Sequence, residues 1–117
     1  MPKPGNYLLI AAMDVEPGKE DLLNEVYDTE HIPAIMKIPG VVSVSRMEKV
    51  PLILGIGGEV KEFPTADKPK FTAIYEIESP EVLKSREWGE AVEYGRWPEQ
   101  VRPYTSNRQF TLQRVTS

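Results

Sequence analysis

The residues from Asn6 to Asp14 (NYLLIAAMD) form an almost unbroken apolar run, which limits the possible folds more than any other segment. Gly5 precedes the run and Pro17-Gly18 follows it, so its length suits a strand better than a long helix. A strand that is apolar on both faces is typical of the centre of a sheet that is covered on both sides. The sequence therefore predicts a central strand with apolar material against each face.

The next segment changes from strand periodicity to helical periodicity. Apolar side chains recur every three or four residues after Lys19, and acidic residues occupy the first turn, where the helix dipole favours them. Pro33 lacks a backbone N–H and disfavours helical dihedral angles in the residue before it. We therefore expect a helix that ends or kinks at Pro33, followed by a short turn over residues 34–37.

Val41–Val50 is predicted to be the second strand, because its side chains alternate after a Pro-Gly turn signal. This alternation predicts that Val42 and Val44 lie on one face, and that Met47 lies on the other face with two serines. Residues 51–70 carry three glycines and three prolines and begin with apolar side chains. A connection of this length is unusual, and we expect an arm or a lid.

The rest of the chain predicts two more strands and a second helix. Phe71–Glu78 alternates regularly, and Ser79-Pro80 provides the N-cap and first helical residue of the next helix. After an irregular return over residues 96–106, Asn107–Val115 alternates again. The order βαββαβ predicts an α+β, ferredoxin-like antiparallel sheet with both helices on one face.

Such a sheet leaves one of its faces bare. We expect apolar residues of the first strand such as Leu9, and alternate side chains of the third strand, to face away from the helices. A second copy of the chain is the simplest cover, and burial of roughly 800 Å² per partner makes an ordinary interface. The sequence therefore predicts a homodimer in which two sheets pack face to face as a dimeric α/β barrel, with a cavity in each subunit.

Composition and charge narrow the classes of function. The 117 residues suit one domain, and 14 Lys and Arg against 18 Asp and Glu give a net charge of −4, which disfavours general nucleic-acid binding. No apolar run has the length that crosses a bilayer, and Met1–Gly5 lacks the layout of a signal peptide, so we expect a soluble, cytoplasmic protein without a membrane partner. With no cysteine and one histidine, a metal site is not expected.

His31 is the only histidine and the first candidate for moving protons, since its ordinary pKa lies near neutral pH. It follows Tyr27 by one helical turn, so Tyr27 is a candidate to position the imidazole. The structural alternative is that His31 caps the helix end beside Tyr27. Glu30 is a second candidate to orient the imidazole, but adjacent helical residues point about 100° apart. Its alternative role is a surface salt bridge.

Tyr75 and Arg46 are candidates to stabilise negative charge. A tyrosine hydroxyl donates a hydrogen bond to an oxyanion, and the guanidinium fork binds a carboxylate or phenolate. Trp88 and Trp97 offer flat apolar walls for an aromatic ligand. The alternatives are core packing for Tyr75, an ion pair for Arg46, and dimer contacts for the two tryptophans.

Residues 27–33 (YDTEHIP) and 38–41 (IPGV), followed by a strand that contains Arg46, resemble the EthD-like members of the dimeric α/β-barrel superfamily. The shared pattern is an aromatic residue, then Glu-His-x-Pro, then Pro-Gly. Residues 87–88 and 95–98 are similar to uncharacterised relatives. The resemblance implies a ferredoxin-like fold and a homodimer. The superfamily includes cofactor-free monooxygenases, lactone isomerases, polyketide cyclases, dehydratases and haem enzymes, so the fold does not choose among activities.

These residues predict a small-molecule-binding protein. The leading hypothesis is a cofactor-independent isomerase, lyase (dehydratase) or monooxygenase that acts on a small apolar, aromatic or polyketide-like compound. We expect His31, Tyr75 and Arg46 to be catalytic. The residues expected to bind the substrate are Tyr27, Glu30, Trp88 and Trp97. One alternative is a non-catalytic ligand-binding or accessory dimer of a catabolic pathway, and another is a haem protein with His31 as the axial ligand.

Overall fold

The central strand of the computed structural model, which describes all 117 residues, lies where the apolar run predicts it. β1 (Tyr7–Val15) is an inner strand of a four-stranded antiparallel sheet with the order β2-β5-β1-β6. The other strands of this sheet are β2 (Val41–Glu48), β5 (Phe71–Ile77) and β6 (Thr105–Arg114). Together with the helices described next, this order confirms the predicted ferredoxin-like fold.

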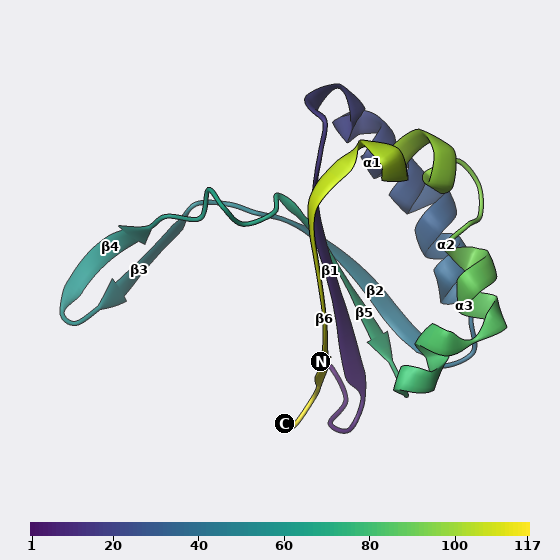
Figure 1. The fold of residues 1–117 in the computed structure, drawn as a ribbon. Coiled ribbons are helices and arrows are strands. Elements are labelled where there is room, and N and C mark those ends of the chain that lie inside the picture. Colours follow the sequence, from purple (N-terminus) through teal and green to yellow (C-terminus); the bar gives the residue numbers. More distant parts are fainter.

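The helices all cover the same face of the sheet (Figure 1). α1 (Glu20–Val26) continues into the π-helical turn η2 (Tyr27–His31) and then into α2 (Ile32–Met36). The return from α3 (Arg86–Ala91) to β6 contains a second π-helical turn, η4 (Trp97–Val101). Short 3₁₀ turns span Pro17–Lys19, Pro80–Lys84 and Arg102–Tyr104. The fully buried side chains between helices and sheet are Leu23, Val26, Ile35, Ile77 and Val101. None of the helices is long and apolar enough to span a membrane.

Pro33 does not end the helix, and the turn expected over residues 34–37 was wrong, because α2 continues to Met36. The backbone N–H of Ile32 donates a hydrogen bond to the carbonyl of Tyr27, five residues earlier. This bond spans one residue more than in an α-helix, so the turn just before the proline is wider. Pro33 then occupies an early position of α2, where a residue without an N–H is tolerated. The wide turn therefore lets one helical segment pass through the proline.

Val42 lies on the opposite face from the predicted one. The pairing of β2 with β5 shifts register between Val41 and Ser43, which is the signature of a β-bulge. The bulge puts Val42 beside Met47 on the bare face, whereas Arg46 approaches the helices. An inserted residue reverses the alternation on one side of the bulge, and the sequence pattern does not reveal it. The strand also ends at Glu48, two residues earlier than expected.

One face of the sheet is bare, as predicted, but Leu9 is not on it. Leu9 pairs with Tyr75 and packs against the core beneath the helices. The bare face carries Leu8, Ile10 and Ile74, of which Ile10 and Ile74 are paired across β1 and β5. Because β1 is apolar on both sides, its pattern does not say which side faces the helices.

The second helix begins where predicted but is broken in two. The Ser79 side chain accepts a hydrogen bond from the Glu81 backbone N–H and starts a 3₁₀ turn. Ser85 has an extended backbone, and its side chain accepts a hydrogen bond from the Trp88 backbone N–H at the start of α3. Each short segment thus has its own serine cap.

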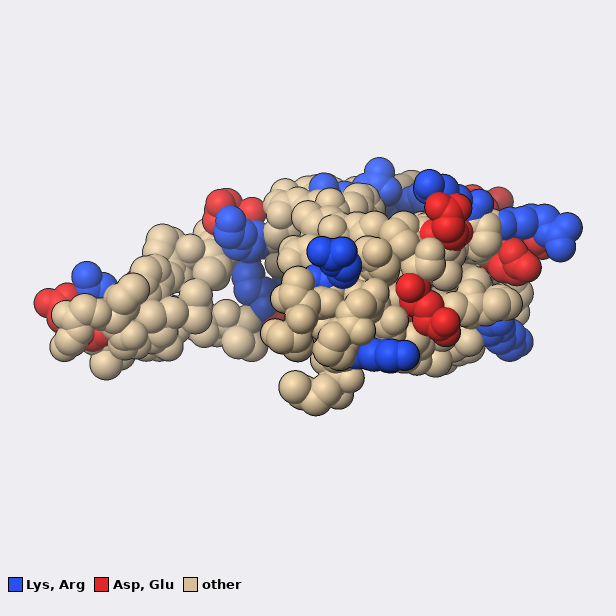
Figure 2. All heavy atoms as spheres, turned by 90° about the horizontal axis from the view of Figure 1, so that it is seen from below, with Lys and Arg blue, Asp and Glu red and all other residues tan.

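Residues 51–70 form an arm. β3 (Leu52–Ile56) and β4 (Glu59–Phe63) pair as an antiparallel hairpin. Gly57 and Gly58 make its turn with φ of 62° and 81°, values that a two-residue hairpin turn requires and that glycine adopts without strain. The arm extends from the side of the sheet opposite to the helices (Figure 1), and charged side chains cover only part of the face of it that Figure 2 shows. It therefore does not cover the helix side of its own sheet.

Candidate functional site

A cavity of about 260 Å³ lies between the helix-facing side of the sheet and the helical layer. Most of its wall is apolar. Five of the residues predicted from the sequence line it together: Tyr27, His31, Tyr75, Trp88 and Trp97. They come from η2, β5, α3 and η4, so the fold brings together side chains that lie up to seventy residues apart in the chain. An apolar cavity with a few convergent polar groups is the usual form of a small-molecule site.

The imidazole of His31 is enclosed by two aromatic rings. Its centroid lies 4.8 Å from that of Trp97, with an interplanar angle of 31°, and 5.1 Å from that of Tyr27 in an edge-on arrangement. The rings of Tyr27 and Trp97 also meet edge to face, at 5.0 Å. Both π-helical turns thus contribute to one aromatic cluster, in which His31 is only 4% exposed.

His31 is neutral at pH 7. Burial, and secondly the positive charge of Arg102, lower the pKa of His31 from 6.5 to about 4. Its Nδ1 is the one buried side-chain nitrogen or oxygen without a hydrogen-bond partner. An unpaired buried polar atom is rare in native proteins and calls for a functional or structural reason. The helix continues past His31 to Met36, so the interpretation of His31 as a helix cap is wrong.

The hydroxyls of Tyr27 and Tyr75 keep their protons at neutral pH. Burial raises the pKa of Tyr27, and the Tyr75 hydroxyl and Arg46 only partly oppose this. Burial also raises the pKa of Tyr75, reinforced by Tyr27. The Tyr75 ring packs edge-on against Trp88 with 5.6 Å between centroids. Two protonated phenols beside a neutral imidazole provide hydrogen-bond donors next to a proton acceptor.

Arg46 does not line this cavity. Its guanidinium donates hydrogen bonds to Asp28 Oδ1, at 3.0 Å, and to Asn24 Oδ1, and lies 4.9 Å from the centroid of the Tyr27 ring. Arg46 and Tyr27 together line a separate small hollow, so the cation contacts the Tyr27 ring outside the cavity that holds His31. The geometry therefore gives Arg46 a positioning contact with Tyr27 in place of the predicted direct contact with a ligand.

Glu30 also lies outside the cavity. Its carboxylate accepts hydrogen bonds from the backbone N–H of Arg96 at 2.9 Å and from Arg96 Nε at 2.6 Å. These bonds, the backbone one first, hold the pKa of Glu30 below its ordinary value. Gly95 has a positive φ of 71°, which glycine adopts without strain, and a Cβ there would meet the Glu30 carboxylate. Glu30 therefore forms a salt bridge with Arg96, the residue before η4. This is the alternative role that the sequence analysis gave it, in place of orienting His31.

Three further cavity residues were not singled out from the sequence as binding residues of this site. Arg102 lies in the 3₁₀ turn after η4, and Arg108 and Phe110 lie in β6. The alternation of β6 puts Arg108 and Phe110 on one face, and the sequence pattern predicts this much. It does not predict that this face lies over the cavity, because that depends on how β6 pairs with β1.

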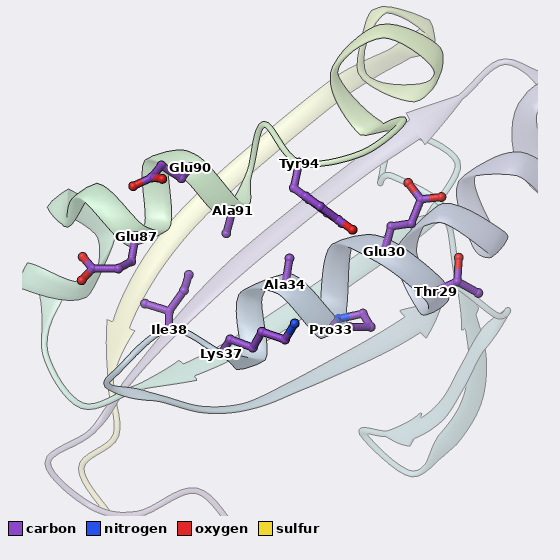
Figure 3. A pocket seen from close by; sticks show the side chains of 10 residues that line it. All are labelled: Thr29, Glu30, Pro33, Ala34, Lys37, Ile38, Glu87, Glu90, Ala91 and Tyr94. Carbon is purple, nitrogen blue, oxygen red and sulfur yellow. The ribbon is translucent and has the colours of Figure 1, made fainter.

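A larger hollow of about 500 Å³ lies on the outer surface between α2 and α3 (Figure 3). Ala34, Ile38 and Ala91 point into it, while the carboxylates of Glu87 and Glu90 point away from its centre (Figure 3). It contains no buried polar atom without a partner. The smaller cavity, which holds His31 and the two phenols, is therefore the better candidate for a chemical site.

Comparison with known proteins identifies the fold. No family model and no curated protein matches the chain. An ethyl tert-butyl ether d (EthD) family protein from Bacillus halodurans superposes with a TM-score of 0.60 and 15% identity, over 95% of this chain and 99% of that one. The heme-degrader MhuD from Mycobacterium tuberculosis, with two hemes bound in its active site, superposes with a TM-score of 0.57 and 15% identity. The superposition covers 95% of this chain and 96% of that one.

A protein from Bacillus cereus described as an antibiotic biosynthesis monooxygenase superposes with a TM-score of 0.51 and 17% identity, over 96% of this chain and 93% of that one. At such identities the likeness concerns the fold and not the activity. The chain shares the fold of these proteins, which is the ferredoxin-like fold that the resemblance of residues 27–33 and 38–41 implied.

Proposed function

We propose that this chain is a cofactor-independent acid–base enzyme that acts on a small, largely apolar molecule bound between the sheet and the helices. The observation that carries the proposal is His31, a neutral imidazole with an unpartnered Nδ1 in the wall of an apolar cavity. A neutral imidazole is able to accept a proton at physiological pH. Small-molecule binding fits the fold, since MhuD holds hemes in its active site.

In the proposed reaction, His31 removes a proton from a carbon next to a carbonyl group of the bound molecule. The negative charge that develops on the carbonyl oxygen accepts hydrogen bonds from the protonated hydroxyls of Tyr75 and Tyr27. An anion formed beside the imidazole raises the pKa of His31, because it stabilises the imidazolium. Trp88 and Trp97 pack against the body of the molecule. Isomerase, lyase and cofactor-free monooxygenase chemistry can each begin with such a step.

The test measures proton removal without knowledge of the natural substrate. The protein is incubated in D₂O with a panel of small aryl ketones, and NMR records exchange at the carbon next to the carbonyl. The wild type is expected to accelerate exchange of at least one ketone, and His31→Gln to slow it by about 10²–10⁴-fold. Tyr94→Phe is the control. Tyr94 lines the larger hollow between α2 and α3 and not the cavity, so this variant should exchange like the wild type.

Two results would contradict this assignment. If His31→Gln exchanges as fast as the wild type, His31 is not the base. If the wild type binds ketones, as seen in the fluorescence of Trp88 and Trp97, yet accelerates no exchange, the non-catalytic ligand-binding or accessory role replaces the enzyme proposal. These are the only two tryptophans, and both line the cavity.

Haem does not fit this cavity. Drug-sized ligands occupy sites of roughly 300–1,000 Å³, so a volume of about 260 Å³ suits a molecule much smaller than haem. The proposed reaction therefore uses no haem.

The proposal includes a homodimer formed through the bare face of the sheet. That face holds a hollow of about 410 Å³ lined by Leu8, Ile74 and other residues. The arm extends on the same side of the sheet (Figure 1), and several of its large apolar side chains are exposed, among them Ile53, Ile56 and Val60. A second copy packed on this face would bury both surfaces, as expected for an interface of two identical chains.

Ile74→Lys is expected to convert this dimer to a monomer. The side chain lies near the middle of the bare face, and an unpaired ammonium buried there opposes association. We expect the dimer dissociation constant to rise at least about 30-fold, the effect of losing about 2 kcal/mol at an interface hot spot. Native mass spectrometry at several concentrations measures this, with Tyr94→Phe as the control. A wild type that stays monomeric would refute the dimer.

A further inference from the structure

The charged residues of the cavity wall are all of one sign. Two arginines, Arg102 and Arg108, line the cavity, and no Asp or Glu does. His31 adds no charge at neutral pH, because its pKa is about 4. The chain as a whole carries a net charge of −4. The charged side chains of the cavity wall are therefore positive, whereas the protein as a whole is negatively charged.

The two arginines differ in their partners. Arg102 Nη1 donates to Glu93 Oε1 at 3.0 Å, and its Nη2 donates to Glu93 Oε2 and to the Val92 carbonyl oxygen. Its charge is thus compensated by Glu93, and its donors are largely used. The side chain of Arg108 is exposed and forms no hydrogen bond or ion pair with any other side chain or backbone group of the chain. Its guanidinium keeps all of its donors free for a ligand.

Arg108 is placed at the cavity by an irregularity in β6. The pairing of β6 with β1 shifts register between Ala12 and Asp14, and Asn107 has a positive φ of 49° in this stretch. Arg108 follows directly, on the same face as Phe110, and both side chains line the cavity. Phe110 is itself largely exposed, which marks this side of the cavity as its open rim. Arg108 therefore stands where a ligand would enter.

We propose that the molecule bound in this cavity is a small carboxylate with an aromatic or aliphatic body, and that Arg108 pairs with its carboxylate group. The inference rests on the proposed function and names the substrate class of the same site. A guanidinium binds a carboxylate through two parallel hydrogen bonds, which also orients the ligand. The apolar body then lies toward Tyr75, Trp88 and Trp97, with the carboxylate at the rim.

Isothermal titration calorimetry with 3-phenylpropionate and 3-phenylpropionamide tests this inference, because the two probes share a body and differ in charge. The full-length wild type is expected to bind the acid about tenfold more tightly than the amide, as for one charged hydrogen-bonded pair at a solvent-accessible rim. Arg108→Gln should remove this difference and leave binding of the amide unchanged. Higher salt should reduce the difference in the wild type.

Arg114→Gln is the matched control, because it removes the same charge from the same strand and does not line the cavity. An equal loss in this variant would show a general effect of net charge and overturn the assignment to Arg108. Equal affinity of the wild type for both probes would also overturn it, while leaving the cavity as a binding site. If neither probe binds or changes the tryptophan fluorescence, both the proposed function and this inference fail.

Discussion

The wild-type protein is expected to lose roughly 3 kcal/mol of folding free energy through His31 alone as the pH falls from 6.5 to 4. The pKa of His31 is 6.5 when solvated and about 4 in the folded protein. Between these values the unfolded chain binds a proton that the folded chain does not, so stability falls as pH falls. The stabilising contribution of neutral His31 is thus present above pH 6.5 and absent below pH 4.

Urea unfolding at several pH values between 7 and 5 measures this effect. His31→Gln should show a nearly flat dependence in that window, because the titrating group is gone. The carboxyls of Glu30, Glu76 and Glu93 have pKa values below the ordinary 4.5, so they destabilise the fold only at lower pH. Glu76→Gln should therefore keep the wild-type slope between pH 6.5 and 5. Equal slopes in the wild type and His31→Gln would contradict the assignment.

Trp97→Ala is expected to destabilise the protein by about 3–5 kcal/mol, the cost of removing a large buried aromatic side chain and leaving a cavity. Trp97 is 6% exposed and contacts both Tyr27 and His31. Its loss removes a ring that packs η4 against Tyr27 and His31 of η2, and leaves the salt bridge between Glu30 and Arg96, the N-cap of η4, in place. Urea unfolding at pH 7, where His31 is mostly neutral in both the folded and the unfolded state, measures the difference.

Trp88→Ala is the matched comparison. Trp88 also lines the cavity, but it is only half-buried and has one aromatic partner, Tyr75. Its removal should cost clearly less than that of Trp97, because less apolar surface returns to water. Trp97→Phe should recover part of the loss, since a ring still packs on His31. A cost for Trp97→Ala that does not exceed that for Trp88→Ala would show that Trp97 is not a packing residue of the site.

Much of the candidate site could be predicted from local spacing. Tyr27 and His31 are one turn apart in any helical conformation, so their proximity follows from the chain itself. The alternation of Phe71–Glu78 placed Tyr75 on the buried face, and the structure confirms this. These predictions succeeded because the backbone period alone determines which side chains share a face.

Predictions from local spacing were wrong where one extra residue interrupts the regular period of a helix or a strand. The π-helical turn before Pro33 and the bulge at Val42 each insert a residue into a regular element. Neither insertion has a strong local signal, because its cost is compensated by packing elsewhere in the fold. The face of Leu9 was misassigned for a related reason: a strand that is apolar on both sides has no preferred side until the helices are in place.

The sequence by itself determined the order of the four sheet strands and of the helices, the ferredoxin-like fold and the pairing of Tyr27 with His31, because these follow from backbone periods and short-range spacing. Only the tertiary structure decided the partners of the charged residues. Arg46 and Glu30 are held by Asp28 and Arg96, while Arg108 is left free at the rim of the cavity. The physical reason is that long, charged side chains reach whichever partner the packing of distant elements brings near, and sequence spacing carries no information about that distance.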